Sequence, residues 1–253
     1  MKISNIPQYF LLILRIKPNE ILGFRILARL ARYLTPSYRL TWPEIDWFKK
    51  ESLTNILTQF EENNGFNAHR RLALQQLLRL IYMVPGDTAE CGVYKGCSSY
   101  IILDSNSKSI YHRTHHIFDS FEGLSEPSES DGSHWKSNDL SVAENVVKGN
   151  LSSFNNYILY KGWIPDRFRD LGDRKFSFVH VDVDLYDPTL ASIEFFYERL
   201  SEGGIFLCDD YGFSTCPGAT AAIDKYLKNK PEKMICLPGG GGFFFKGCTT
   251  DPE

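Results

Sequence analysis

Four aspartates follow two apolar segments that have the composition of buried strands. They are Asp182 and Asp184 after residues 176–181, and Asp209 and Asp210 after residues 204–208. Both segments are apolar, and the first is rich in aromatic and β-branched residues, as is typical of strands buried on both faces of a parallel sheet. Ligands of open α/β sheets bind at the carboxyl ends of the strands. Carboxylates that converge there repel one another, so either they lie apart or a hard divalent cation such as Mg²⁺ binds between them.

A glycine loop with an acid at its front supplies a second chemical signal. Residues 90–96 read Glu-Cys-Gly-Val-Tyr-Lys-Gly and lie between a predicted strand and a predicted helix. Because Glu90 leads the loop, we expect an amine-bearing ligand, such as the amino-acid part of S-adenosylmethionine, rather than a pyrophosphate. Asp119 ends the next predicted strand, where an acid is well placed to bind ribose hydroxyls. A generic tight turn is the alternative interpretation of the loop.

These residues require a sheet to position them. From residue 67 onward, strand-like and helix-like segments alternate, which predicts an α/β fold: a doubly wound, mostly parallel, Rossmann-like sheet covered by helices on both faces. The last two predicted strands, 234–237 and 243–246, are joined by the glycine-rich turn 238–242 without a helix. This pattern predicts a C-terminal antiparallel hairpin on the sheet edge.

The N-terminal segment differs in charge from the rest of the chain. Seven basic residues in the first 40 positions stand against Glu20 alone: Lys2, Arg15, Lys17, Arg25, Arg29, Arg32 and Arg39. Apolar residues recur there at helical spacing, which predicts an amphipathic basic helix. It would contact either an anionic membrane surface or, as we favour, the core or a second subunit of a homo-oligomer. We expect residues 1–66 to form a helical extension or lid and residues 67–253 the catalytic domain.

The composition excludes several classes of protein. The 253 residues are 43% hydrophobic and 23% charged, with a formal net charge of -3, so the chain lacks the basic footprint of a nucleic-acid-binding protein. Its six cysteines include no C-x-x-C pair, which indicates reduced thiols. The apolar run at residues 9–14 is too short to span a bilayer. We therefore expect a cytoplasmic enzyme.

The histidines carry weaker signals. His112, His115 and His116 invite a transition-metal interpretation, but no acid or cysteine stands at ligand spacing, so we expect a solvated loop. His180 lies in an apolar segment and is predicted to be buried and hydrogen-bonded rather than a base.

Six motifs occur together between residue 85 and the end of the chain. They are Pro85-Gly86-Asp87, Glu90-x-Gly92-Val93-Tyr94-x-Gly96, Asp119-Ser120-Phe121-Glu122-Gly123-Leu124, Lys161-Gly162-Trp163, Asp182-x-Asp184-Leu185-Tyr186 and Asp209-Asp210-Tyr211-Gly212. Together they resemble the macrocin O-methyltransferase family of class I, S-adenosylmethionine- and metal-dependent sugar O-methyltransferases of natural product biosynthesis. The first 60 or so residues match this family poorly, although they would shape the sugar pocket.

The resemblance implies a cofactor site and a metal site. It implies that the methionine end of S-adenosylmethionine lies against Glu90, Gly92 and Gly96, and that Asp119, Ser120 and Phe121 surround the adenosine. The remaining cofactor-binding residues implied are Tyr94, Ser98, Gly162 and Trp163. Mg²⁺ is implied to bind Asp182, Asp209 and Asp210.

A sugar hydroxyl has a pKa far above neutrality, so methyl transfer needs a base and a Lewis acid at the oxygen. Our hypothesis makes Asp182 both base and metal ligand, while Asp184 supports it or contacts the substrate. His134 and Trp135, in the long segment 125–138, are candidates to cover a sugar face.

The sequence therefore predicts Mg²⁺-assisted O-methylation of a sugar hydroxyl on a glycosylated metabolite or glycan. One alternative is methylation of a catechol or other phenol. A metal-dependent phosphohydrolase is another, but it would need a lysine or arginine at the same sheet edge, and Lys161 is the only near candidate in the sequence.

Overall fold

The computed structural model describes residues 20–34, 51–62 and 67–249, and the chain divides into two compact units, residues 1–54 and 55–253. In the first unit, helix α2 (Glu20–Leu34) confirms the predicted amphipathic helix. Its residues Leu27, Leu30 and Leu34 are exposed. The basic residues Lys2, Arg15, Lys17 and Arg39 of the N-terminal segment lie outside the described ranges. The partner of this helix and the predicted domain boundary at residue 66 stay predictions.

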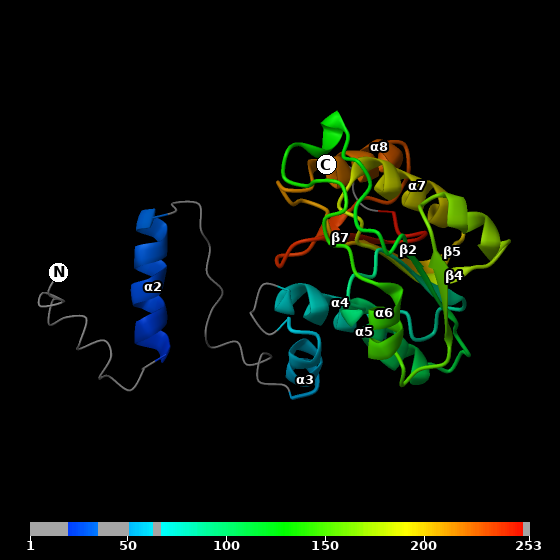
Figure 1. Ribbon diagram of the computed structural model, residues 1–253, viewed down its shortest axis with the longest axis horizontal. Coiled ribbons are helices and arrows are strands. Elements are labelled where there is room, and N and C mark those ends of the chain that lie inside the picture. Colours follow the sequence, from blue (N-terminus) through cyan, green and yellow to red (C-terminus); the bar gives the residue numbers. More distant parts are fainter. Residues whose placement is uncertain (1–19, 35–50, 63–66, 250–253) are drawn as a thin grey trace, which may run out of the picture. The chain divides into compact units, whose positions relative to one another are not determined.

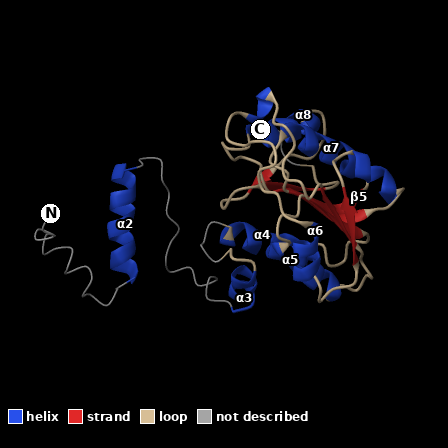
Figure 2. Cartoon of the chain, in the orientation of Figure 1, coloured by secondary structure: helices blue, strands red, loops and turns tan. Residues whose placement is uncertain are grey.

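The second unit is built on one seven-stranded sheet with the order β3-β2-β1-β4-β5-β7-β6. Figure 2 shows its strands in red between the blue helices. The strands are β1 (Asp87–Cys91), β2 (His115–Asp119), β3 (Tyr157–Lys161), β4 (Phe176–Val181), β5 (Leu200–Cys208), β6 (Ile235–Cys236) and β7 (Gly242–Phe245). β1 to β5 pair in parallel, whereas β7 is antiparallel to both β5 and β6. The doubly wound sheet and its C-terminal antiparallel hairpin are thereby confirmed.

The helices that cover the two faces of this sheet are α4 (Ala68–Leu80) and α5 (Cys97–Ser107), and α7 (Tyr186–Tyr197) and α8 (Pro217–Leu227). The described residues also form α3 (Glu51–Gln59), which begins in the first unit, α6 (Glu144–Asn150) and the short 3-10 helices η2 (Glu129–Asp131) and η3 (Asp166–Leu171). Figure 1 shows α4 and α5 on one side of the sheet and α7 and α8 on the other. Leu77 and Ile101 pack in one core and Ile193 and Phe196 in the second, so β4 is buried on both faces.

The strand register brings the predicted site residues to one edge. Cys91 pairs with Val181 across β1 and β4, and Val181 pairs with Cys208 across β4 and β5. The residues that follow these three are Gly92, Asp182 and Asp209. Because parallel strands in register end at the same edge, the glycine loop and both acidic pairs meet there.

All six cysteines are free, and four of them are buried, which agrees with the prediction of reduced thiols. Within the described ranges, every helix is too short or too polar to cross a membrane.

Candidate active site

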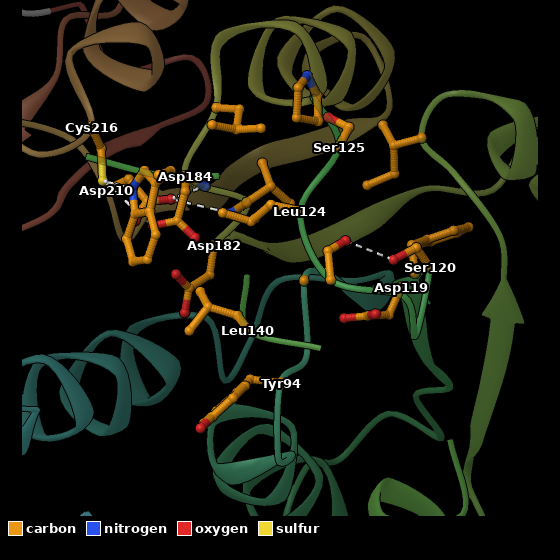
Figure 3. Close-up of a pocket in the computed structure, with 18 of the residues that line it drawn as sticks. Tyr94, Asp119, Ser120, Leu124, Ser125, Leu140, Asp182, Asp184, Asp210 and Cys216 are labelled. Atoms are coloured by element: carbon orange, nitrogen blue, oxygen red, sulfur yellow. Dashed lines mark hydrogen bonds between the residues drawn. The ribbon is translucent and has the colours of Figure 1, made fainter. Parts of the chain in front are cut away.

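A cavity of about 890 Å³ lies at the carboxyl ends of the strands (Figure 3). Nine of the predicted cofactor-binding, metal-binding and catalytic residues line it: Gly92, Tyr94, Asp119, Ser120, Gly162, Trp163, Asp182, Asp184 and Asp210. His134 and Trp135, the candidates to cover a sugar face, line it as well. Small-molecule sites typically occupy about 300–1,000 Å³. The cavity is therefore large enough for a cofactor and a part of a second ligand.

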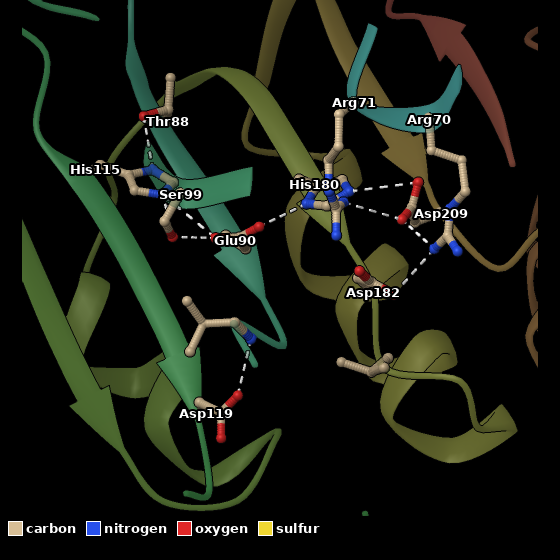
Figure 4. Close-up of polar contacts among 12 residues, drawn as sticks. Arg70, Arg71, Thr88, Glu90, Ser99, His115, Asp119, His180, Asp182 and Asp209 are labelled. Atoms are coloured by element: carbon tan, nitrogen blue, oxygen red, sulfur yellow. Dashed lines mark hydrogen bonds and ion pairs between the residues drawn. The ribbon is translucent and has the colours of Figure 1, made fainter. Parts of the chain in front are cut away.

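The four aspartates form two pairs, which we call carboxylate groups. Asp182 and Asp209 form the first carboxylate group (Figure 4). The Arg70 guanidinium forms an ion pair with Asp209 and lies 3.6 Å from Asp182 Oδ1. Arg71 Nη1 is 3.5 Å from Asp209 Oδ2, while its Nε donates to Glu62 at 2.8 Å. Both arginines come from the first turn of α4, so a helix that precedes the sheet supplies the positive charge at its edge.

The environment separates the pKa values of these two aspartates. Burial would raise the pKa of Asp209, but Arg70, His180 and Arg71 hold it well below its ordinary range. Burial raises the pKa of Asp182 to about 7, with the charge of Asp209 adding to the rise and Arg70 opposing it. Asp209 therefore favours its ionised form, whereas the pKa of Asp182 lies closer to neutrality.

Asp184 and Asp210 form the second carboxylate group. Asp210 Oδ2 accepts hydrogen bonds from the backbone N–H groups of Val183 at 3.1 Å and Asp184 at 2.8 Å. The Cys216 thiol donates to Asp184 Oδ1 at 3.4 Å. Asp184 has φ of 59°, a left-handed conformation that is strained for a non-glycine residue. Burial raises its pKa to about 6.

The arginines correct one sequence-based expectation. Lys161 was expected to be the only cation near this sheet edge, which is wrong, because Arg70 and Arg71 line the cavity. Arg70 is 139 positions from the aspartate that it pairs with, so no local sequence pattern could have indicated the contact. Both arginines are paired with carboxylates, which leaves little positive charge for a phosphate group.

Glu90 lies beneath the cavity rather than in its wall. Its side chain is fully buried, accepts a hydrogen bond from Ser99 Oγ and lies 2.7 Å from His180 Nδ1. It is not among the described residues that line the cavity. Burial would raise the pKa of Glu90, but the nearby imidazoles of His115, at 3.7 Å, and His180, which is hydrogen-bonded, hold it well below its ordinary range. Its predicted cofactor contact stays a prediction.

The histidines are more deeply placed than the sequence suggested. His180 is buried and hydrogen-bonded, as predicted. The expectation of a solvated loop is confirmed for the exposed His112 but is wrong for His115 and His116, which are fully buried in β2. His115 Nδ1 lies 2.9 Å from Thr88 Oγ1, and His116 Nε2 lies 3.1 Å from Asp87 Oδ2. These polar partners on β1 satisfy the ring nitrogens and so offset the free-energy cost of burying the two rings.

The predicted adenosine-binding residues cluster at the ends of β2 and β3. Asp119 accepts hydrogen bonds from Val93 N at 2.8 Å and Phe121 N at 2.6 Å, which ties the glycine loop to β2. Trp163 is 40% exposed and lines the cavity. Three other predicted cofactor-binding residues are not among the described residues that line the cavity. Gly96 is the N-cap of α5, and Ser98 and Phe121 are buried.

Two sets of side chains are close enough together to hold a metal ion. One contains His180, Asp182 and Asp209, and the other contains Asp184, Asp210 and Cys216. The adjacent residues Asp209 and Asp210 therefore fall into different sets. His180 Nε2 is buried without a hydrogen-bond partner among the described residues, although it lies 3.8 Å from Asp209 Oδ1.

Sequence comparison finds relatives that are named as O-methyltransferases. Demethyldecarbamoylnovobiocin O-methyltransferase of Streptomyces niveus is 25% identical over 217 residues, which cover 77% of this chain and 79% of the relative. A tetracenomycin 4'-O-methyltransferase of Streptomyces olivaceus, named for its action on a dimethoxy-rhamnosyl derivative, is 28% identical over 174 residues, covering 60% of this chain and 66% of the relative.

Solved structures agree with the fold. The calicheamicin methyltransferase CalS11 superimposes with a TM-score of 0.64 at 21% identity, covering 84% of this chain and 96% of that chain. The O-methyltransferase NovP gives a TM-score of 0.59 at 22% identity, covering 75% of this chain and 87% of that chain. The family match spans residues 67–236, which is more than half of the sequence. The chain belongs to the macrocin O-methyltransferase (TylF) family.

Proposed function

We propose that this protein transfers the methyl group of S-adenosylmethionine to a sugar hydroxyl on a glycosylated metabolite or glycan, with assistance from Mg²⁺. The family and the antibiotic-modifying relatives support O-methylation of a glycosylated compound. The single observation that carries the proposal is the shared cavity, in which Asp119 and Trp163 at one end and Asp182 and Asp184 at the other line the same space.

The cofactor would bind across the ends of β1, β2 and β3. The exposed ring of Trp163 offers an apolar surface for the adenine, and Asp119 offers carboxylate oxygens for the ribose. Gly92, with φ of 81°, lets the backbone line the cavity without a side chain. These residues fit S-adenosylmethionine in shape and polarity. Glu90 would act from below, by keeping the loop and His180 in place.

The donor set also fits a hard divalent cation. Asp182, Asp209 and Asp210 are the proposed ligands, and oxygen donors of this kind suit Mg²⁺. Asp182 and Asp209 are close enough to share one ion, whereas Asp210 lies in the neighbouring set with Asp184, so its participation requires its side chain to turn. His180 Nε2 lies 3.8 Å from Asp209 Oδ1, and its raised pKa makes it a charged partner of this carboxylate rather than a further metal donor. Since Arg70 already pairs with Asp209, a metal ion at this carboxylate would share it with a guanidinium. Bound Mg²⁺ would supply Lewis-acid polarisation of the acceptor hydroxyl.

Asp182 is the proposed base. Its carboxylate lines the cavity and would accept the hydroxyl proton there, and without a bound cation burial raises its pKa to about 7. Asp184 lies beside it with a pKa of about 6 and would hydrogen-bond a neighbouring hydroxyl of the acceptor. Arg70 would hold Asp182 in place and limit the repulsion from Asp209.

Calorimetry and turnover test this proposal together. The wild-type chain should bind S-adenosylmethionine at submillimolar concentration and release S-adenosylhomocysteine when given a rhamnosylated acceptor and Mg²⁺. Chelation of the metal should abolish turnover and leave cofactor binding intact. Absence of cofactor binding at millimolar ligand would refute the proposal. Faster turnover of catechol than of any glycoside would instead favour the phenol alternative.

A further inference from the structure

The segment 124–140 is a closed loop rather than a flexible connection, and we call it the acceptor loop. Its two ends are joined by backbone hydrogen bonds of 2.9 Å, from Leu124 N to Asp139 O and from Asn138 N to Leu124 O. A Cβ atom on the preceding Gly123 would come within 2.5 Å of Asp139 O, so the neck is tightly packed. The loop therefore has a fixed shape at its base.

Asp131 fastens the middle of this loop to the catalytic unit. Its side chain is 3% exposed, and Oδ2 accepts hydrogen bonds from Ser128 N and Oγ, both at 2.7 Å. Oδ1 accepts from Tyr186 N at 2.6 Å, at the first residue of α7. An anion at a helix N-terminus is stabilised by the unpaired N–H groups there. Asp131 thus acts as a latch between the loop and α7.

The start of α8 leaves room for this latch because of a glycine. A Cβ atom on Gly218 would lie 2.0 Å from Asp131 Oδ1 and 2.9 Å from Tyr186 Cβ. Alanine at this position would therefore displace the carboxylate from its hydrogen bonds. The acceptor loop, α7 and α8 meet at this one point.

Trp135 is held by one edge at the wall of the cavity. Its Nε1–H donates to Cys216 Sγ at 3.4 Å, and the same thiol donates to Asp184 Oδ1. The ring of His134 packs edge-to-face on Trp135 at a centroid distance of 4.7 Å. Trp135, His134 and Asp184 all line the cavity, so an aromatic surface lies beside a carboxylate that can bind hydroxyl groups.

This aromatic surface is separated from the proposed cofactor end. Trp163 follows β3, whereas the residues that Trp135 and its partner thiol contact, Asp184 and Cys216, follow β4 and β5. In the sheet, β2 and β1 lie between β3 and β4. Figure 3 shows Asp119 and Ser120 on one side of the cavity and Asp184 and Cys216 on the other. A ligand at Trp135 would therefore be the acceptor rather than the adenosine.

We infer that the acceptor loop forms the acceptor-binding wall and that Trp135 is its specificity-determining residue, packing on the apolar face of an uncharged sugar ring. A sugar ring offers C–H groups to an indole and hydroxyl groups to carboxylates, which matches the pairing of Trp135 with Asp184. This inference rests on the proposed methyltransferase function and adds the residue that recognises the acceptor.

A pair of tryptophan variants tests the inference. The full chain is loaded with S-adenosylhomocysteine and Mg²⁺, and methyl α-L-rhamnoside is titrated while binding is followed by ligand-observed NMR. Trp135→Ala should weaken rhamnoside binding roughly tenfold, and Trp135→Phe should restore it to within about threefold. Neither variant should change the dissociation constant of S-adenosylhomocysteine. Trp163→Ala should do the reverse and weaken S-adenosylhomocysteine alone.

The outcomes separate this inference from the proposed function. Equal rhamnoside affinity in the wild type and Trp135→Ala, with S-adenosylhomocysteine bound normally, overturns the role of Trp135 and leaves the methyltransferase proposal intact. If the loaded wild-type protein binds no rhamnoside, the sugar class is wrong. Failure of the wild type to bind S-adenosylhomocysteine removes the proposed function and, with it, this inference.

The latch is tested from two directions. Asp131→Ala and Gly218→Ala should each weaken rhamnoside binding about as much as Trp135→Ala, because both release the loop, while S-adenosylhomocysteine affinity shows that the fold persists. Glu129→Ala, at an exposed residue of the same short helix, is the matched control and should bind like the wild type. Wild-type rhamnoside affinity in both latch variants would contradict the role of Asp131.

Discussion

The two carboxylate groups at the cavity differ in what neutralises them. Asp182 and Asp209 lie beside Arg70, whereas Asp184 and Asp210 are contacted by backbone N–H groups and a thiol. Full positive charge keeps Asp209 ionised, while burial together with the charges of Asp184 and Asp182 raises the pKa of Asp210 well above its ordinary range. Carboxylates at equivalent strand ends can therefore differ in protonation, because the partner rather than the strand sets the pKa.

This comparison assigns the chemistry to Asp182, and removing its charge should have the largest effect. Asp182→Asn should lower turnover by about 10²–10⁴-fold, since a proposed general base is lost. S-adenosylmethionine binding, measured by calorimetry, should stay close to that of the wild type. Asp173→Asn is a matched control, because Asp173 is an exposed aspartate just before the other end of β4. Full activity of Asp182→Asn would rule out the assigned base.

The second-largest effect is expected from Arg70, the arginine beside Asp182 and Asp209, on the free energy of unfolding. Arg70→Gln leaves the buried Asp209 with less positive charge, and breaking such a pair costs about 3 kcal/mol in the free energy of unfolding. Urea denaturation of the metal-free chain measures this loss. Arg79→Gln, an exposed position on the same helix, should change the free energy by less than about 0.5 kcal/mol. Equal stability of the two variants would mean that Arg70 contributes little.

The buried histidine predicts a pH dependence. Burial alone would lower the pKa of His180, but Asp209 and Glu90 raise it to about 10 in the folded chain. Its protonation therefore stabilises the fold fully below about pH 6.5, and this stability is lost as the pH rises toward 10, by at most about 1.4 kcal/mol per pH unit.

Glu90→Gln should flatten this decline, because the variant lacks one of the two carboxylates that favour the charged imidazole. Thermal unfolding between pH 6.5 and 10, in the presence of a chelator, measures the slope. Glu194→Gln, at an exposed glutamate of α7, should retain the wild-type slope. A Glu90→Gln slope as steep as the wild type would show that Glu90 does not sustain the charge of His180.

The smallest effect is expected in the second group. Cys216→Ser keeps a donor for Asp184 and an acceptor for Trp135, so turnover should stay within about threefold of wild type and the unfolding free energy within about 1 kcal/mol. Cys208→Ser, in the apolar interior of β5, should destabilise more, by about 1–3 kcal/mol, because it buries a hydroxyl. A large loss of turnover in Cys216→Ser would give the thiol itself a role.

The sequence by itself determined the sheet and the edge that carries the site. The apolar composition of Phe176–Val181 predicts a strand buried on both faces, and strand ends in a parallel sheet converge without further information. The glycine turn before Phe243 likewise predicts a hairpin, since no helix fits between the two strands. These features follow from local composition and spacing, which a single sequence contains.

Only the tertiary structure decided which groups meet at that edge. Arg70 and Asp209 lie far apart in the chain, so their ion pair depends on how α4 packs on the sheet. The same holds for Glu90, whose burial against His180 depends on the register of β1 and β4. Charge partners, and therefore pKa values, arise from contacts between distant segments, and local sequence patterns do not encode them.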